Sequence, residues 1–279
     1  MLATLEAYSS WQSAPLLPLS ERGAQTDLIQ IRNIDGLGPV NSDINTSPYG
    51  SVDGESFTGA HTPKRNIVIT VGLNPDWNIW SMESLRRLLY AYFMPKQPVK
   101  LIFTSNDDFP TVEISGYTES VEPNIFAKDV EIQISVICPD PYFTAVEPTV
   151  ITGNVGGPVK DVDYNGSVET GVTLKVYQIV PPNASMITAQ LGNPVMSYMQ
   201  VPAVVSATKY FILSSVTGNK YIQNVETGSG LITNLLSKAI EGSTWPILQP
   251  GINKFSVVSN TVPLAQDWEL TYFERFGGL

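Results

Sequence analysis

The chain has 279 residues, of which 43% are hydrophobic and 15% are charged, and its 26 acidic and 16 basic residues give a net charge of −10. A chain of this length can bury roughly 70–75% of the surface that its unfolded form exposes, so it needs no disulfide or metal to fold. The negative charge, with Lys and Arg scattered along the chain, disfavours sequence-specific nucleic-acid binding. One cysteine excludes an intrachain disulfide, and one cysteine with one histidine cannot form a Cys/His zinc site.

The amino-acid usage is typical of a β-rich protein. The chain has 21 glycines and 21 prolines, which favour short strands and turns over long solvated helices. The N-terminal segment lacks the basic start and the unbroken apolar core of a signal peptide. No stretch approaches about 18 uncharged apolar residues, so we expect no membrane span and synthesis in the cytoplasm.

The first part of the chain predicts two strands separated by a long polar stretch. Apolar and polar residues alternate over Thr26–Ile34, which is typical of a strand with one buried face. Gly36–Pro63 is instead rich in Gly, Pro, Ser, Asn and Asp. Loops longer than about 12–15 residues are usually functional or disordered, so both interpretations stay open for this stretch. The second strand is expected at Asn66–Leu73, where alternate Ile and Val residues share one face.

A helix is predicted between Ser81 and Pro95. Ser81 is a typical N-cap, and Pro95 cannot continue a helix. Apolar residues recur at helical spacing, as expected for a helix that packs one face across a sheet. These residues are Met82, Leu85, Leu88, Leu89, Tyr92 and Phe93. The residues that fall largely on the other side are Arg86, Arg87 and Tyr90.

Three further strands complete the predicted N-terminal domain. They are Val99–Thr104, Thr111–Thr118 and Lys128–Cys138. Turns rich in Asn, Asp and Pro lie between them. We therefore expect residues 1–145 to form a mainly antiparallel β-domain with one helix packed across it.

A change in composition marks the expected domain boundary near residue 145. Glycine and proline punctuate the next segment, and short strands follow it. These strands are Gly171–Ile179, Tyr210–Ser214, Lys220–Val225, Asn253–Val258 and Asp267–Phe276. Pro181, Pro182 and Pro194 argue against a central strand between the first two. Residues 146–279 are expected to form a β-sandwich or jelly roll.

No constellation in the sequence is typical of catalysis. His61, the one available imidazole base, lies in the polar stretch, and no serine stands in a GxSxG motif. Asn41–Asn45 and Asp161–Asn165 lack the Gly and Glu of an EF-hand loop. Glycoside hydrolysis needs a pair of carboxylates, but spaced carboxylates are common in so acidic a chain and do not indicate this activity. The pairs present are Asp107/Asp108, Glu119/Glu122 and Asp161/Asp163. We therefore expect no catalytic residue, no cofactor, no metal site and no enzymatic activity.

The tryptophans suggest two kinds of surface. Trp77 and Trp80 precede the predicted helix and are expected to anchor a core or an interface. Trp245 lies next to Pro246 and belongs either to a packed turn or to a stacking surface for a sugar. A carbohydrate-binding protein is therefore one alternative.

Several segments together form a recognisable order and spacing. They are Arg65–Leu73, the helix core Leu88–Phe93, Ile114–Asn124, Ala127–Phe143 with its CPDPYF ending, Thr244–Asn253 and Trp268–Leu279. This order and spacing resemble those of phage distal tail proteins, the ring-forming baseplate hub subunits of long-tailed phages. Gly36–Pro63 is the departure, because its sequence does not map onto the family.

The resemblance implies a fold and a role. The fold would be a tail-tube-like antiparallel β-barrel or sandwich with one α-helix, followed by a jelly-roll or galectin-like β-sandwich. The protein would be a structural component of the virion tail tip that forms a homo-oligomeric ring, expected to be a hexamer, around a channel for DNA. The ring would join the tail tube protein to the hub or spike protein and to peripheral receptor-binding proteins. Alternatives are a tail-tube protein proper and a carbohydrate-binding tail adhesin.

Under this resemblance the polar stretch becomes an arm that contacts neighbouring subunits. The candidate ring or partner contacts are Tyr49, Phe57, His61, Trp77, Trp80, Arg86, Arg87 and Tyr90.

Overall fold

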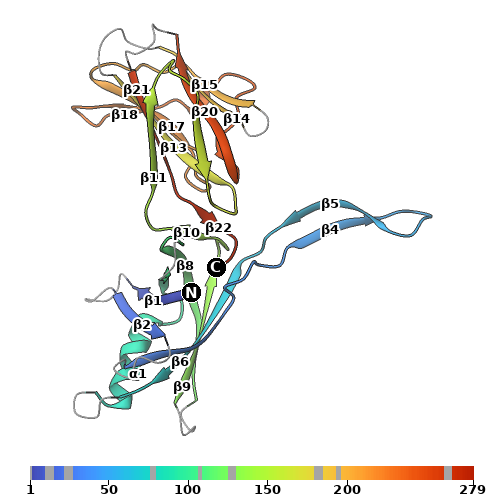
Figure 1. Cartoon of the computed structure of the whole chain (residues 1–279), viewed down its shortest axis with the longest axis vertical. Helices are drawn as coiled ribbons and strands as arrows, with labels where there is room; N and C mark the ends of the chain where they lie inside the picture. Colours follow the sequence, from blue (N-terminus) through green and yellow to red (C-terminus); the bar gives the residue numbers. More distant parts are fainter. Residues whose placement is uncertain are drawn as a thin grey trace. The chain divides into compact units, whose positions relative to one another are not determined.

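The chain divides into two compact units, coloured along the sequence in Figure 1. The computed structural model describes residues 2–9, 16–21, 28–75, 80–105, 109–124, 130–178, 185–192, 196–260 and 266–279. The first unit comprises Met1–Val146 and Phe276–Leu279, and the second comprises Glu147–Arg275. The sequence analysis assigned residues 146–279 to the second domain, whereas Phe276–Leu279 lie in the first unit. A long-range contact accounts for this difference, because the ring centroids of Phe109 and Phe276 are 4.7 Å apart.

The first unit is a closed β-barrel. Its strands are β1 (Leu2–Tyr8), β2 (Leu16–Glu21), β3 (Ile29–Asp35), β6 (Arg65–Leu73), β7 (Pro98–Ser105), β8 (Val112–Pro123), β9 (Glu131–Cys138), β10 (Phe143–Ala145) and β22 (Arg275–Phe276). The sheet runs β22-β10-β8-β7-β1-β2-β3-β6-β9, and β8 also pairs with β9, which closes the barrel. The pair β2–β3 is parallel, and the neighbouring pairs around it are antiparallel.

The predicted strands of the N-terminal domain overlap β3, β6, β7, β8 and β9 and are confirmed. Residues 26–27 and 128–129 of those predictions lie outside the described residues. Strands β1 and β2 were not predicted, because their short alternations are broken by polar residues and proline.

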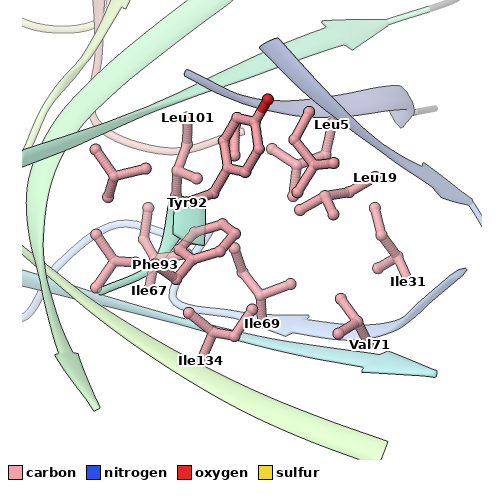
Figure 2. Packing of buried hydrophobic residues seen from close by; sticks show 14 of the residues in the cluster. Leu5, Leu19, Ile31, Ile67, Ile69, Val71, Tyr92, Phe93, Leu101 and Ile134 are labelled. Atoms are coloured by element: carbon pink, nitrogen blue, oxygen red, sulfur yellow. The ribbon is translucent and has the colours of Figure 1, made fainter. Parts of the chain in front are cut away.

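Helix α1 (Met82–Tyr92) contributes to the barrel core (Figure 2). The Ser81 side chain accepts a hydrogen bond from the Ser84 backbone N–H at 3.2 Å, so the predicted N-cap is confirmed. Tyr92 and Phe93 lie among apolar side chains of the barrel strands, such as Ile69 and Leu101. The helix ends before Pro95, as predicted. This packing joins the helix and the barrel strands in one core.

The second unit is a sandwich of two antiparallel sheets. Its elements are β11 (Thr149–Asn154), β12 (Lys160–Tyr164), β13 (Thr170–Gln178), β14 (Ile187–Gly192), β15 (Met196–Val201), β16 (Lys209–Ser214), β17 (Tyr221–Glu226), β18 (Ile232–Asn234), the 3-10 helix η1 (Leu236–Lys238), β19 (Ile247–Leu248), β20 (Gly251–Ser259) and β21 (Gln266–Tyr272). One sheet runs β11-β21-β13-β16-β17-β18, with β19 paired to β13, and the other runs β12-β20-β14-β15. Buried residues of both sheets form one core around Trp268 and Phe255, whose rings meet edge to face.

The fold class predicted from the sequence is confirmed: a mainly β chain with a helix-bearing barrel and a β-sandwich. Two details were wrong. The predicted strand Asp267–Phe276 is divided into β21 and β22, which belong to different sheets. Strand β14 lies between β20 and β15 and is therefore a central strand, although the nearby prolines argued against one. Those prolines lie outside the described residues.

Candidate functional site: an exposed hairpin arm and its anchor

The polar stretch before β6 forms a β-hairpin instead of an irregular loop. Strands β4 (Asp43–Pro48) and β5 (Glu55–His61) pair with each other and with no other described strand. We call residues 43–61 the arm; its strands run side by side in Figure 1. Its side chains are exposed almost throughout. A two-stranded hairpin is marginally stable alone in water, so an arm with this exposure is expected to need a partner surface.

The two faces of the arm differ in chemistry. Residues directly opposite each other in a hairpin point to the same face. The pairs Ile44↔Ala60, Thr46↔Phe57 and Pro48↔Glu55 therefore share one face, which carries two large apolar side chains and has the Glu55 carboxylate at its turn end. The other face is polar and carries the pairs Asp43↔His61, Asn45↔Gly59 and Ser47↔Ser56. Ile44 and Phe57 are 64% and 68% exposed, so the described residues of the first unit leave the apolar face largely uncovered.

The turn of the arm adds two further exposed apolar side chains. Tyr49 is 55% and Val52 is 73% exposed. Hydrogen bonds keep the hairpin in register around this turn, from the Tyr49 N–H to the Gly54 carbonyl and from the Thr46 hydroxyl to the Glu55 carboxylate. The arm is thus an ordered element with an uncovered apolar surface.

The root of the arm is held against the barrel by a buried arginine. Arg65, the first residue of β6, is 1% exposed. Its Nη1 donates to the carbonyls of Gly36 and Gly38, at 2.5 and 2.7 Å, just before the arm. Its Nε donates to Pro141 at 2.6 Å and its Nη2 to Gly277 at 2.5 Å. One guanidinium therefore joins three segments that are far apart in the sequence.

The surroundings of Arg65 are unusual for a cation. Its guanidinium carbon lies 4.6 Å from the centroid of the Phe143 ring. In the described part of the chain, no carboxylate is within ion-pair distance of it. Burial lowers the pKa of Arg65, against a smaller opposing effect of nearby Cys138 and Tyr142. Backbone carbonyls, together with the aromatic ring, therefore take the place of a counter-ion.

Backbone geometry fixes the same root. Gly36 has φ +90°, and a Cβ built there would lie 2.1 Å from the Asn66 carbonyl oxygen. Only glycine fits this position, because both the conformation and the space exclude a side chain. The Leu279 N–H also donates to the Leu37 carbonyl at 3.0 Å. The root thus packs between β6 and the last residues of the chain.

The predicted contact residues fall on two separate elements. Tyr49, Phe57 and His61 all lie on the arm. His61 is at its base, with Nε2 3.4 Å from the Asp43 carboxylate, and both side chains are largely exposed.

The other predicted contact residues lie at α1. Trp80 and Tyr90 are half-buried and pack against the barrel core, whereas Arg87 is exposed and pairs with Glu83 at 3.0 Å. Arg86 is half-buried. Trp77 lies outside the described residues.

Sequence reasoning missed Ile44, Val52 and Arg65. Ile44 and Val52 gave no signal, because apolar residues scattered singly on a protein surface are normal. Arg65 gave no signal either. Its partners are carbonyl groups, which every residue carries.

The structure also bears on the metal sites, carboxylate pairs and membrane spans that the sequence disfavoured. Among the described residues, no group of three or more His, Cys, Asp or Glu side chains could hold a metal ion. Glu119 accepts a hydrogen bond from Ser135, and Asp161 pairs with Lys254. Asp107 and Asp108 lie outside the described residues. No helix in the described ranges is long and apolar enough to cross a membrane.

Cys138 and Trp245 have structural surroundings. Cys138 is fully buried, and burial raises the pKa of its thiol to about 11. Trp245 packs against the core of the sandwich, with the Lys220 ammonium 5.5 Å from its ring centroid. The packed-turn interpretation of Trp245 is therefore favoured over a free stacking surface.

Comparison with known proteins finds a phage family similar to part of the first unit. Residues 24–133 match the family described as phage tail protein RIFT-related domain. This range covers β3, the arm, β6, α1, β7 and β8. The first unit is thus similar to a phage tail protein domain over these residues. No curated protein matches the chain.

The whole chain is similar in fold to a distal tail protein. The Dit protein of phage SPP1, described as a paradigm of the hub adsorption apparatus in phages that infect Gram-positive bacteria, aligns with a TM-score of 0.67 at 16% identity. The alignment covers 98% of this chain and 99% of that one. A chain of the phage p2 baseplate, in its activated conformation with strontium, aligns with a TM-score of 0.47 at 11% identity over 96% and 97% of the two chains. The resemblance to distal tail proteins is confirmed by the domain match and the fold.

Proposed function

We propose that this chain is the distal tail ring subunit of a phage virion, and that its arm docks on a second copy of the chain. The observation that carries the proposal is the uncovered apolar face of the arm. The tail-protein domain and the fold shared with the Dit protein of phage SPP1 support it. The role is structural and needs no catalytic group.

We take the partner that covers the arm to be a second copy of the same chain. Fully burying a large apolar side chain contributes about 1.5–3 kcal/mol, and the arm exposes Ile44, Tyr49, Val52 and Phe57. If each arm reaches the next subunit, the contact is heterologous, and a heterologous contact closes into a ring when the rotation fits. Closure covers every arm in the assembly, whereas a free subunit leaves its own exposed.

The remaining partners follow from the same proposal. A ring, expected to be hexameric, would stack on the tail tube protein with one face and hold the central hub or spike protein with the other. The second unit would face outward and take receptor-binding proteins. The acidic composition of the whole chain, with a net charge of −10, suits a channel whose lining does not bind the passing DNA. The protein would reside at the virion tail tip after synthesis in the host cytoplasm.

The test is the assembly state of the purified full chain, by light scattering and negative-stain imaging. A hexameric ring has a mass of six times 30.5 kDa, about 183 kDa. The double substitution Ile44→Ser with Phe57→Ser should yield monomers with unchanged circular dichroism. The matched control on the polar face, Ser47→Ala with Ser56→Ala, should still form rings.

Other outcomes discriminate between the alternatives. Polymers of indefinite length would favour a tail-tube protein. Monomers of the unmodified chain at all concentrations would overturn the ring. Rings that survive the apolar-face substitutions would overturn the role of the arm.

A further inference from the structure

The second unit carries an open pocket of about 420 Å³ on the solvent side of its larger sheet. Lys175 and Tyr177 of β13, Lys209 and Tyr210 of β16, Thr227 after β17 and Glu269 of β21 line it. On β13, the intervening side chains are buried in the sandwich core, so Lys175 and Tyr177 point outward. The volume is within the range of about 300–1,000 Å³ typical of small-molecule sites.

Two tyrosine rings form the apolar part of the pocket, and the Lys175 ammonium lies over them. The pairing of Val176 with Phe211 places Tyr177 and Tyr210 next to each other on neighbouring strands. The Lys175 Nζ lies 4.9 Å from the centroid of the Tyr210 ring and 5.8 Å from that of Tyr177. In the described part of the chain Lys175 forms no ion pair, so its N–H groups are available as donors.

The charges around the pocket do not favour an anion. The Lys209 Nζ pairs with the Glu226 carboxylate at 2.9 Å, so its charge is already compensated. Glu269 lines the pocket itself. Burial raises the pKa of Tyr177, and the carboxylates of Asp267 and Glu269 raise it further. The lysines are therefore balanced by acidic groups.

We propose that this pocket binds a neutral saccharide. A pyranose has an apolar face of C–H groups, which an aromatic ring covers, and a rim of hydroxyls that both donate and accept hydrogen bonds. Tyr177 and Tyr210 supply the rings, Lys175 supplies donors, and Glu269 supplies an acceptor. The Thr227 hydroxyl can do either. This site is distinct from Trp245, which packs on the core, and it does not depend on ring assembly.

The test uses the full chain and the methyl glycosides of glucose, galactose and N-acetylglucosamine, measured by saturation-transfer NMR. A ligand of this size in a shallow site is expected to bind with a Kd of about 1 mM. Tyr210→Ala should weaken binding about tenfold, as loss of an aromatic contact does. Tyr210→Phe, which keeps the ring, should bind within about threefold of the unmodified chain.

A matched control lies on the same sheet. Tyr221 of β17 is half-buried and does not line the pocket, so Tyr221→Ala should leave binding unchanged. Glucuronic acid and inorganic phosphate serve as anionic probes. Their binding in preference to the neutral glycosides would overturn the neutral class. No binding by any glycoside, or binding that Tyr210→Ala leaves unchanged, would overturn the site.

Discussion

Replacing Arg65 by methionine should destabilise the first unit strongly, although neither residue would meet solvent. The guanidinium donates hydrogen bonds to the carbonyls of Gly36, Gly38, Pro141 and Gly277. Methionine fills similar space but leaves these acceptors without a donor. Hydrogen bonds to a charged group contribute about 1.5–3 kcal/mol each, but burying the cation costs several kcal/mol, so the sum overstates the net effect. A buried acceptor left without a donor costs about 1–3 kcal/mol, and the desolvation cost of the cation is recovered, so we expect a net loss of about 3–5 kcal/mol.

Thermal unfolding of the full chain measures this loss. For a unit of this size, 1 kcal/mol corresponds to about 2–4 °C, so the transition of the first unit should fall by about 10 °C. Hydrogen exchange should also accelerate at the Leu279 amide, which bonds to the Leu37 carbonyl at the root of the arm. The second unit should keep its own transition.

Arg87→Met is the matched control. Arg87 lies on the surface of α1 and pairs with Glu83, an interaction of about 0.3–0.5 kcal/mol. Its loss should shift the transition by no more than about 2 °C. If Arg65→Met were equally mild, the carbonyls would be satisfied without the guanidinium, and the anchor role of Arg65 would be refuted.

Three further predictions concern the first unit. Burial raises the pKa of the Cys138 thiol from 9.0 to about 11, so the thiol ionises at lower pH in the unfolded chain than in the folded chain. The free energy of unfolding should therefore be constant below pH 9 and fall by about 2 kcal/mol between pH 9 and 11. Urea titrations across this pH range measure the change. Cys138→Ala should lack that part of the pH dependence; an identical profile would contradict the assignment. Gly36→Ala should lower stability by more than about 2 kcal/mol in urea unfolding, whereas Gly38→Ala, where a Cβ meets nothing within 4 Å, should be nearly neutral. Phe93→Ala should lower the free energy of unfolding by about 3–5 kcal/mol in the same measurement. Met94→Ala, at an exposed position, should lower it by less than about 1 kcal/mol. Equal losses for the two variants would argue against the core position of Phe93.

Local patterns in the sequence were enough for the elements with strong periodicity. The helix was bounded by Ser81 and Pro95, and both signals act within one turn of the backbone. The alternation in β6 and β9 likewise depends only on which residues share a face. Where the alternation was short, as in β1 and β2, the pattern was too weak to predict a strand.

The arm shows the limit of local reasoning. Its composition predicted an excursion from the barrel, and the excursion exists. Its hairpin register, with Ile44 opposite Ala60 and Thr46 opposite Phe57, could not be read from polar residues that alternate without a clear hydrophobic pattern. Only that register reveals that the large apolar side chains lie on one face.

The sequence alone therefore determined the β-rich class, the helix and the absence of an evident catalytic constellation, because these depend on neighbours along the chain. The tertiary structure decided the closure of β8 on β9, the anchoring of three distant segments by Arg65, and the meeting of Tyr177 with Tyr210 beside Lys175. These features join residues far apart in the sequence. Their geometry is set by strand register and barrel closure, for which a linear pattern of residues carries no local signal.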